Sequence, residues 1–403
     1  MKRFNSSLIG IFISITILNL TIPTASAVPA SFTFVGSGYG HGVGLSQIGA
    51  KGQALEGKSA NEILTYYFPG ASITPVIDAQ PIRVNTAHQI TSAIFTVFNQ
   101  SPGTSAGINL TNSGSDTAPT VLVTNPIKFI LNGKFISAIS KGKSLGTSNL
   151  WSLELASKNS YLIQNVGGST IKLKYGTIQL RPVPVTGKGS FIEVTDTMQL
   201  HDEYLYGISE VPSMWPAAAL QAQAITARTY AMSRLGIIRN DCDCNVYATK
   251  YDQVYGGYAK ELEPKYGALW RQAVDASKVD DQSGYAITYD GLPINVYFFS
   301  SSGGQTQRAI DVWGTDIPYL VSVPDPWSLD KKLNPKYAKW ERVIPQDVMA
   351  KAFKLPDVAS FVINSRTKTG SVLKITAYSS TGAKSTLAVG AFKSAVKLPS
   401  SWF

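Results

Sequence analysis

Between Ala71 and Phe191 the chain consists mostly of short runs in which apolar and polar residues alternate. Gly, Asn, Ser and Pro separate these runs, and such residues favour turns. Because successive side chains of a strand point to opposite faces, the alternation predicts an antiparallel β region. We expect a Ser- and Gly-rich loop over Asn99–Thr120, and strands at Ile94–Phe98, Val121–Val123, Lys128–Leu131, Ile171–Lys174 and Thr177–Leu180.

The clearest helical pattern runs from Pro216 to Leu235, where Ala and Leu side chains recur along one narrow face that permits close packing. Shorter helices are expected at Ile48–Leu55 and after Ser59, which begins a capping box with Glu62. The chain therefore predicts an α+β fold in which strands dominate, with one long helix beside the active groove.

The first 27 residues have the pattern of a secretory signal peptide. A basic start is followed by an apolar run from Leu8 to Leu20 and by small residues at Ala25 and Ala27. The run is shorter than the roughly 20 residues that a membrane-spanning helix needs. We expect cleavage near Ala27, no stable membrane span afterwards, and a secreted or wall-associated protein, with a retained membrane anchor as the alternative.

The net charge of +10 falls to +8 when Lys2 and Arg3 are removed with the signal peptide. A basic surface attracts polyanions, which for an exported protein are wall polymers and anionic lipid. No Lys/Arg-rich run or aromatic–basic nucleic-acid motif occurs, so nucleic acid is not an expected partner.

Cys242 and Cys244 are separated by one residue. Zinc normally takes four protein ligands in a structural site, and none of the three histidines is close to this pair in sequence. A local disulfide or two uninvolved thiols are therefore favoured over a metal site. No cofactor is expected.

Glu210 lies just before the predicted long helix, next to Val211, Met214 and Trp215. Apolar surroundings disfavour the ionised carboxylate and raise its pKa towards a value useful for proton donation near neutrality. Glu210 is therefore the candidate catalytic acid/base. The alternative is a simple interaction with the helix N-terminus.

Two glycine-rich segments are candidate binding loops. His41, Ser46 and Gln47 occur in a run of alternating glycines, which let backbone amides approach a ligand closely. Ser301 lies in a hydroxyl- and glycine-rich turn that follows a predicted strand, a composition suited to sugar hydroxyls. A plain structural turn remains the alternative for both segments.

Several blocks together resemble the family of stage II sporulation protein D and the LytB amidase enhancer. They cover roughly half of the chain after Ala27: Gly40–Ala50 with Glu62–Gly70, Tyr204–Pro212 with Ala219–Ala231, Gln253–Gly257, Phe299–Gly304 and Trp313–Trp327. The commoner family arrangement places the His41 block last, so its position here indicates a circular permutation. A permutation requires neighbouring termini, and we expect Ser31 close to Phe403 and His41 in the same groove as Glu210.

The resemblance implies four segments: a signal peptide (1–27), a permuted segment that completes the catalytic domain (28–75), an accessory β region (76–185) and a main family domain (186–403). It also implies that Glu210 is the catalytic glutamate of a lytic transglycosylase, which cleaves peptidoglycan glycan strands and leaves anhydromuramic ends. Some members bind zinc through a His and two more widely spaced Cys, a pattern that is absent here. The candidate substrate-binding residues are His41, Ser46, Gln47, Arg228, Tyr230, Gln253, Tyr255 and Ser301.

The alternative function is a non-catalytic glycan-binding protein that stimulates a cell-wall amidase, which is then a candidate partner. An enzyme requires the carboxylate of Glu210, whereas an enhancer does not.

Overall fold

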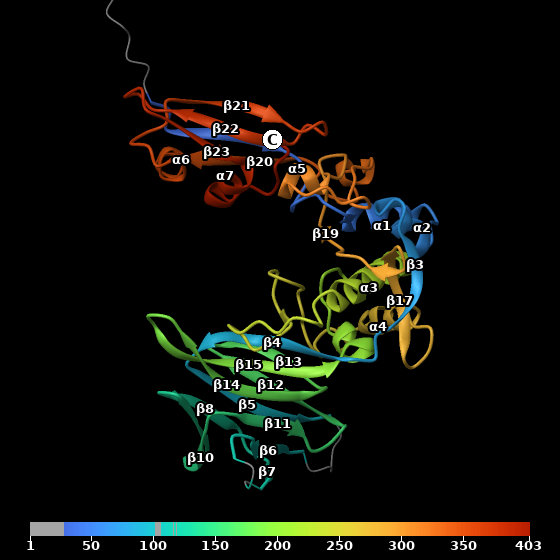
Figure 1. Ribbon diagram of the computed structural model, residues 1–403, viewed down its shortest axis with the longest axis vertical. Helices are drawn as coiled ribbons and strands as arrows, with labels where there is room; N and C mark the ends of the chain where they lie inside the picture. The colour runs from blue at the N-terminus through green and yellow to red at the C-terminus, as the bar shows by residue number, and fades with distance from the viewer. Residues whose placement is uncertain (1–27, 101–105, 116, 118) are drawn as a thin grey trace, which may run out of the picture.

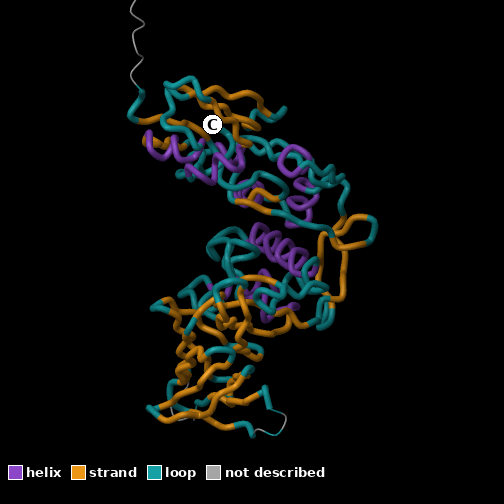
Figure 2. The backbone as a smooth tube through the Cα atoms, turned by 60° about the vertical axis from the view of Figure 1, so that its left-hand side comes forward, coloured by secondary structure: helices purple, strands orange, loops and turns teal. Residues whose placement is uncertain are grey.

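The computed structural model describes residues 28–100, 106–115, 117 and 119–403, so the predicted signal peptide lies outside the described residues. Along the longest axis of the molecule a strand-rich body, a central group of helices and a small mixed module follow one another (Figure 1). The tube view shows most of the strands at one end and the helix α3 near the middle (Figure 2). This is a strand-dominated fold with several sheets, as the sequence predicts.

The strand-rich body contains two sheets. The seven-stranded sheet has the order β16-β4-β15-β14-β11-β6-β7 and is antiparallel except for the β16–β4 pair. Its strands are β4 (Pro81–Ile90), β6 (Ile108–Asn112), β7 (Val121–Val123), β11 (Trp151–Leu155), β14 (Thr177–Val185), β15 (Gly189–Gln199) and β16 (Val246–Tyr247).

The six-stranded sheet has the order β10-β9-β8-β5-β12-β13. Its strands are β5 (Ser92–Asn99), β8 (Ile127–Asn132), β9 (Phe135–Ser140), β10 (Lys143–Ser148), β12 (Ser160–Val166) and β13 (Ser169–Leu173). Phe95 and Phe129 of this sheet and Trp151 of the larger one are buried, with the Phe129 and Trp151 rings 6.1 Å apart. The alternating pattern thus sends every second side chain into a core shared by the two sheets.

Two sequence predictions about this body need correction. The loop predicted over Asn99–Thr120 contains β6, because Ile108 and Leu110 alternate with polar residues and are buried against the sheet. The seven-stranded sheet also takes in β15 and β16, which lie outside the predicted accessory region. β16 brings the chain that follows the main helix directly against β4.

The central group is organised around α3 (Ala217–Met232), which contacts α1, α2, α4 and β17. The buried alanines of α3 allow this close approach. The other elements are the π-helical turn η1 (Leu200–Tyr204), the helices α1 (Gln47–Leu55), α2 (Ala60–Tyr67) and α4 (Gly267–Asp275), and the strands β3 (Ser72–Ile77), β17 (Ser283–Tyr289) and β18 (Leu292–Pro293). The predicted capping box is confirmed, since Ser59 and Glu62 each accept a hydrogen bond from the other's backbone amide.

The small module has a hydrophobic core of its own, which includes Phe34, Phe353 and Phe392. It consists of β1 (Ser31–Gly36), β20 (Trp340–Pro345), α6 (Gln346–Phe353), β21 (Ser360–Arg366), β22 (Val372–Tyr378), β23 (Lys384–Ala388) and α7 (Val389–Val396). Between it and the central group lie β2 (Leu45–Ser46), β19 (Phe298–Phe299), α5 (Ala309–Trp313) and the 3-10 turn η2 (Pro326–Leu329).

The strand that begins at Ser31 lies beside the C-terminus, as expected from the sequence. The rings of Phe34 and Phe403 are 5.4 Å apart, and the Ser37 amide donates a 2.9 Å hydrogen bond to the Trp402 carbonyl. This proximity meets the geometric requirement of a circular permutation, which itself stays a prediction. In the described part of the chain, every helix is too short or too polar to cross a bilayer.

Candidate functional site

Glu210 lies on the short connection between η1 and α3, and a second segment of the chain holds that connection in place. Ile208 forms an antiparallel bridge with Tyr255, and the Ser209 amide donates to the Val254 carbonyl at 2.8 Å. The Val254 amide in turn donates to Glu210 Oε1 at 2.6 Å. The carboxylate is therefore oriented by a fixed backbone group rather than by a mobile side chain.

The surroundings of Glu210 tune its protonation. Burial raises the pKa of Glu210 to about 7, although the hydrogen bond from Val254 opposes the shift. A carboxyl with this pKa exchanges its proton readily near neutral pH, which is what a general acid/base requires. Of the apolar neighbours expected from the sequence, Val211 is buried, whereas Met214 is 62% exposed. The raised pKa therefore comes from burial of the loop and not from a contact with Met214.

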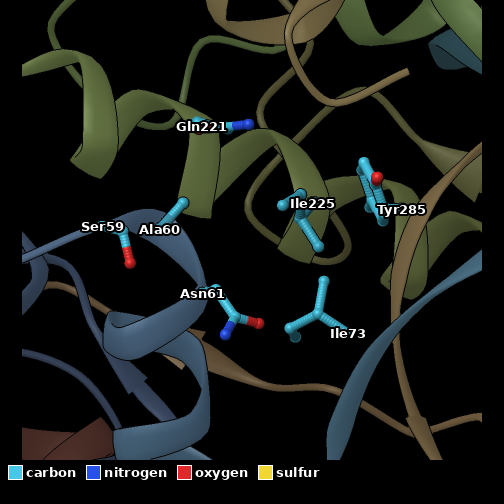
Figure 3. Close-up of a pocket in the computed structure, with 7 residues that line it drawn as sticks. All are labelled: Ser59, Ala60, Asn61, Ile73, Gln221, Ile225 and Tyr285. Carbon is cyan, nitrogen blue, oxygen red and sulfur yellow. The ribbon is translucent and has the colours of Figure 1, made fainter. Parts of the chain in front are cut away.

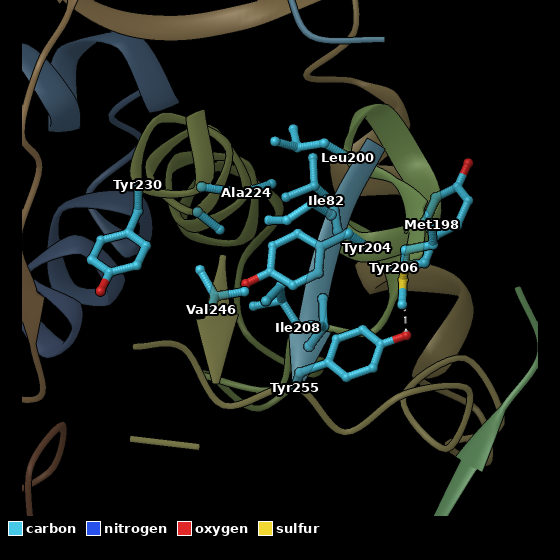
Figure 4. Close-up of a cluster of buried hydrophobic side chains, with 14 of the residues drawn as sticks. Ile82, Met198, Leu200, Tyr204, Tyr206, Ile208, Ala224, Tyr230, Val246 and Tyr255 are labelled. Atoms are coloured by element: carbon cyan, nitrogen blue, oxygen red, sulfur yellow. Dashed lines mark hydrogen bonds between the residues drawn. The ribbon is translucent and has the colours of Figure 1, made fainter. Parts of the chain in front are cut away.

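Tyr204 and Tyr255 belong to the buried cluster that also contains Ile208, two residues before Glu210 (Figure 4). Tyr204 and Tyr255 stack with ring centroids 5.6 Å apart, and the Tyr204 hydroxyl donates to Gln253 Oε1 at 2.9 Å. Burial raises the pKa of both tyrosines well above the ordinary value, so they remain neutral. Gln253 is 0% exposed and Tyr255 4%. Both residues are buried and support the Glu210 loop, which does not fit their predicted role in substrate binding.

Asp252 anchors the segment that carries Val254. Arg239 binds both carboxylate oxygens at 2.7 Å, the Tyr230 hydroxyl donates at 2.7 Å, and the Tyr247 amide donates at 2.8 Å. Burial would raise the pKa of Asp252, but these hydrogen bonds bring it below its ordinary value. Tyr230, predicted to bind substrate, is buried and serves this anchor. Asp252 and Arg239 were not predicted, and the only sequence signal was the position of Asp252 next to the Gln253–Gly257 block.

Arg228 belongs to a buried charged network. Its Nε donates to Asp78 at 2.6 Å, and the other Asp78 oxygen lies 2.6 Å from His201 Nδ1. Further hydrogen bonds from Arg228 reach the carbonyl and hydroxyl of Ser277. Arg228 and Asp78 are both 0% exposed. Arg228 therefore offers no atom to a ligand and holds this network together, which does not fit its predicted role in substrate binding.

The glycine block joins α1 to the main helix. Ser46 is fully buried and caps α1 through a 3.1 Å hydrogen bond from the Gly49 amide. Gln47 Nε2 donates to Gln223 of α3 at 3.3 Å. Both side chains hold elements together and have little exposed surface for a ligand. Ser301 is also 0% exposed, and its backbone pairs with Tyr39, so its hydroxyl is out of reach of a sugar.

His41 lies beside α5. Its ring is 5.4 Å from Trp313 and accepts a 3.1 Å hydrogen bond at Nδ1 from the Val43 amide. Burial, together with the charge of Lys393, lowers the pKa of His41 to about 4, so the ring is neutral at physiological pH. It lines a pocket of about 520 Å³ whose other residues come from the small module and from 307–312. Glu210 is not among them, so this pocket does not form the common groove expected for the two residues.

Another pocket, of about 320 Å³, lies between the start of α2 and α3 (Figure 3). Side chains from these two helices and from β3 and β17 surround it: Ser59, Ala60, Asn61, Ile73, Gln221, Ile225 and Tyr285. None of these residues belongs to the Glu210 loop.

Cys242 and Cys244 form a disulfide, with Cα atoms 5.2 Å apart. This was one of the two arrangements that the sequence favoured. The described residues contain no group of three or more His, Cys, Asp or Glu side chains placed to hold a metal ion.

Residues 189–289 match the family model described as "Stage II sporulation protein". This segment belongs to the stage II sporulation protein family. It contains Glu210, α3 and the Asp252 anchor, so the family resemblance found in the sequence is confirmed where the candidate acid/base lies.

Curated relatives agree with this assignment. The chain is 34% identical over 171 residues to stage II sporulation protein D of Bacillus subtilis (strain 168), covering 40% of this chain and 48% of that protein. It is 33% identical over 187 residues to the protein of the same name from Bacillus amyloliquefaciens, covering 45% of this chain and 52% of that protein. It is 32% identical over 117 residues to the amidase enhancer of Bacillus subtilis (strain 168), covering 29% of this chain and 14% of that protein.

The chain thus spans about half the length of the two sporulation relatives it matches. No solved structure matches this chain.

Proposed function

We propose that this protein is an exported lytic transglycosylase that cleaves the glycan strands of peptidoglycan, with Glu210 as its single acid/base. The observation that carries the proposal is the Glu210 carboxyl, held by the Val254 amide and poised by burial at a pKa of about 7. The family match over residues 189–289 supports a role at the cell wall. The signal peptide at 1–27 would deliver the protein there.

The chemistry needs one carboxyl in two protonation states. Protonated Glu210 donates its proton to the glycosidic oxygen as the bond from that oxygen to the anomeric carbon of muramic acid breaks. The resulting carboxylate then removes the proton from the hydroxymethyl group of the same muramic acid. That oxygen bonds to the anomeric carbon, which closes an anhydro ring and returns Glu210 to its protonated state.

An intramolecular nucleophile explains how one carboxylate suffices. Retaining and inverting glycosidases use two carboxyl groups, one of which attacks the sugar or activates water. A hydroxyl on the substrate itself has a high effective concentration at the anomeric carbon and takes over that role. The surroundings of Glu210 fit this mechanism, because burial and the Val254 amide are the causes of its pKa shift, and Asp252, in the segment that carries Val254, is bound by Arg239.

A second candidate function is stimulation of a cell-wall amidase without cleavage. The similarity to a protein named amidase enhancer favours it. The two functions differ in whether the Glu210 carboxyl is required.

The test is release of soluble fragments from purified peptidoglycan, both intact and stripped of its peptides, by the wild-type protein and by Glu210→Gln. Glu203→Gln is a matched control, because Glu203 is also half-buried, has a pKa raised by burial and accepts a backbone hydrogen bond, from Gln199 at 2.8 Å. We expect release by wild type and Glu203→Gln and a loss of at least about 100-fold in Glu210→Gln. No release by any of the three would leave the enhancer function, whereas equal release by all three would remove Glu210 from the reaction.

A further inference from the structure

A pocket of about 380 Å³ lies where the seven-stranded sheet meets the chain that follows the disulfide. One wall comes from β4 and the other from β16 and the turn after it. The lining residues are Asn85, Thr86, Ala87, His88, Tyr247, Thr249 and Tyr251. Its volume is within the range of about 300–1,000 Å³ typical of small-ligand sites.

One segment of the chain connects the pocket to Glu210. β16 pairs in parallel with β4, and the register places Tyr247 next to Asn85. The same segment continues through Asp252 to Val254, whose amide binds Glu210. Since three residues span at most about 11 Å, the Tyr251 backbone lies within that distance of Val254. A polymer bound at Glu210 can therefore reach the pocket with its neighbouring units.

The β4 wall is built around a buried carboxylate. Glu193 is 1% exposed and accepts hydrogen bonds from Asn85 Nδ2 at 2.8 Å and from the Gln89 amide at 3.0 Å. His88 Nδ1 lies 2.9 Å from the same carboxylate. This contact fixes the imidazole and places its other nitrogen, Nε2, on the opposite edge of a ring that is 35% exposed.

The backbone at this wall is also unusual. The pairing of β4 with β15 shifts register near Val194, and Gln89 has a φ of 52°, in the left-handed region that non-glycine residues rarely adopt. The hydrogen bond from the Gln89 amide to Glu193 stabilises this conformation. Such strained positions, held by surrounding structure, concentrate at ligand sites.

The opposite wall is aromatic. Tyr251 is 80% exposed, and its ring is 6.5 Å from that of Tyr247, which in turn is 5.1 Å from the His88 ring. Tyr247 is held by its hydroxyl on Asp241 at 2.9 Å and by Arg239 over its ring. An exposed tyrosine next to a fixed aromatic pair, with imidazole and hydroxyl groups at its side, suits the flat apolar face and polar edge of a sugar ring.

We propose that this pocket is a sugar-binding subsite, in which an N-acetylated amino sugar of the glycan strand stacks on Tyr251 and is hydrogen-bonded by His88 Nε2 and the Thr249 hydroxyl. The proposal rests on the proposed function for the identity of the strand. It gives the accessory β region a role, because β4 supplies half of the pocket while the sporulation-family segment supplies Glu210. The subsite would hold the strand in register for cleavage at Glu210.

The test is binding of a peptide-free tetrasaccharide of alternating N-acetylglucosamine and N-acetylmuramic acid, measured by calorimetry in the Glu210→Gln protein so that no cleavage intervenes. Adding Tyr251→Ala should weaken binding about tenfold, equivalent to about 1.4 kcal/mol, whereas Tyr251→Phe should retain the affinity. Tyr378→Ala is the control, because Tyr378 is also exposed but lies in the small module. Because Tyr251 is exposed, its replacement should not disturb folding, so a loss of affinity would reflect a lost contact with the sugar.

Unchanged affinity with Tyr251→Ala, an equal loss with Tyr378→Ala, or binding only of strands that carry peptides would overturn the subsite. These outcomes are separable from failure of the proposed function. If wild-type protein cleaves glycan through Glu210 while Tyr251→Ala binds normally, only the subsite is wrong. If Glu210→Gln still cleaves but Tyr251→Ala loses affinity, the acid/base assignment is wrong and the subsite stands.

Discussion

The Val254 amide donates a 2.6 Å hydrogen bond to Glu210 Oε1. This contact joins two segments that are 44 residues apart in sequence. Because Asp252 anchors the segment that carries Val254, it also helps to position the carboxylate. The position of Glu210 thus depends on residues that do not themselves touch a substrate.

The pKa of Glu210 predicts how activity depends on pH. The reaction begins with protonated Glu210, whose pKa is about 7 in the free protein. We expect kcat/KM to be level on the acid side of pH 7 and to fall about tenfold for each pH unit above it. The measurement is kcat/KM for release of glycan fragments from pH 5 to 9. A rate that rises with pH over this range would show that Glu210 does not act first as an acid.

The same shift predicts that Glu210 lowers stability at alkaline pH. Its folded pKa is above the ordinary value of 4.5, so the folded state holds the proton more tightly than the unfolded state, and stability falls as pH rises from about 4.5 through 7. Glu210→Gln cannot ionise and should gain on the order of 1–2 kcal/mol at pH 8 but little at pH 4, after allowance for partial exposure. Urea unfolding at the two pH values measures this. An equal effect at both would contradict the shift.

The buried network predicts that Arg228 acts through stability. Replacing Arg228 with Met leaves Asp78 as a buried charge without its guanidinium partner, which should cost about 3–5 kcal/mol in the free energy of unfolding. Chemical denaturation of Arg228→Met checks the value. If stability were unchanged while glycan affinity fell, Arg228 would be a binding residue after all.

The Asp252 anchor predicts a positioning effect on turnover. Asp252→Ala removes the acceptor for Tyr230, Arg239 and the Tyr247 amide, and so loosens the segment that carries Val254. We expect kcat to fall at least about tenfold, as small misplacements of catalytic groups do. Asp252→Asn keeps some of the hydrogen bonds and should recover part of the loss. Steady-state kinetics of both variants, with folding checked by circular dichroism, make the comparison. Equal kcat in Asp252→Ala and wild type would contradict the anchor.

Local patterns were sufficient for much of the fold. Alternation located the strands β5, β7, β8, β13 and β14, and the Ser59–Glu62 spacing identified a capping box that the structure confirms. The predicted long helix ends at Met232 rather than Leu235, followed by a turn in which the Ser233 hydroxyl donates to the Tyr230 carbonyl. The strand β6 was missed because its alternation is embedded in a Ser- and Gly-rich stretch.

For the candidate site, motifs indicated a region of the chain but not the depth of each side chain. Gln253 and Tyr255 lie in a family block, yet they pack under the loop rather than in a groove. Arg228 depends on Asp78, 150 residues away, and no local pattern reveals such a partner. The His88–Glu193 contact, which joins two neighbouring strands across a register shift, was equally hidden.

The central claim is tested most directly by the chemistry of the newly formed chain ends. Peptide-stripped glycan is digested in water enriched in oxygen-18, and the products are identified by mass spectrometry. We predict anhydromuramic ends that contain no oxygen-18 with wild-type protein, and no such ends with Glu210→Gln. Reducing ends labelled with oxygen-18 would show hydrolysis by water, and anhydromuramic ends that persist in Glu210→Gln would remove Glu210 from the reaction.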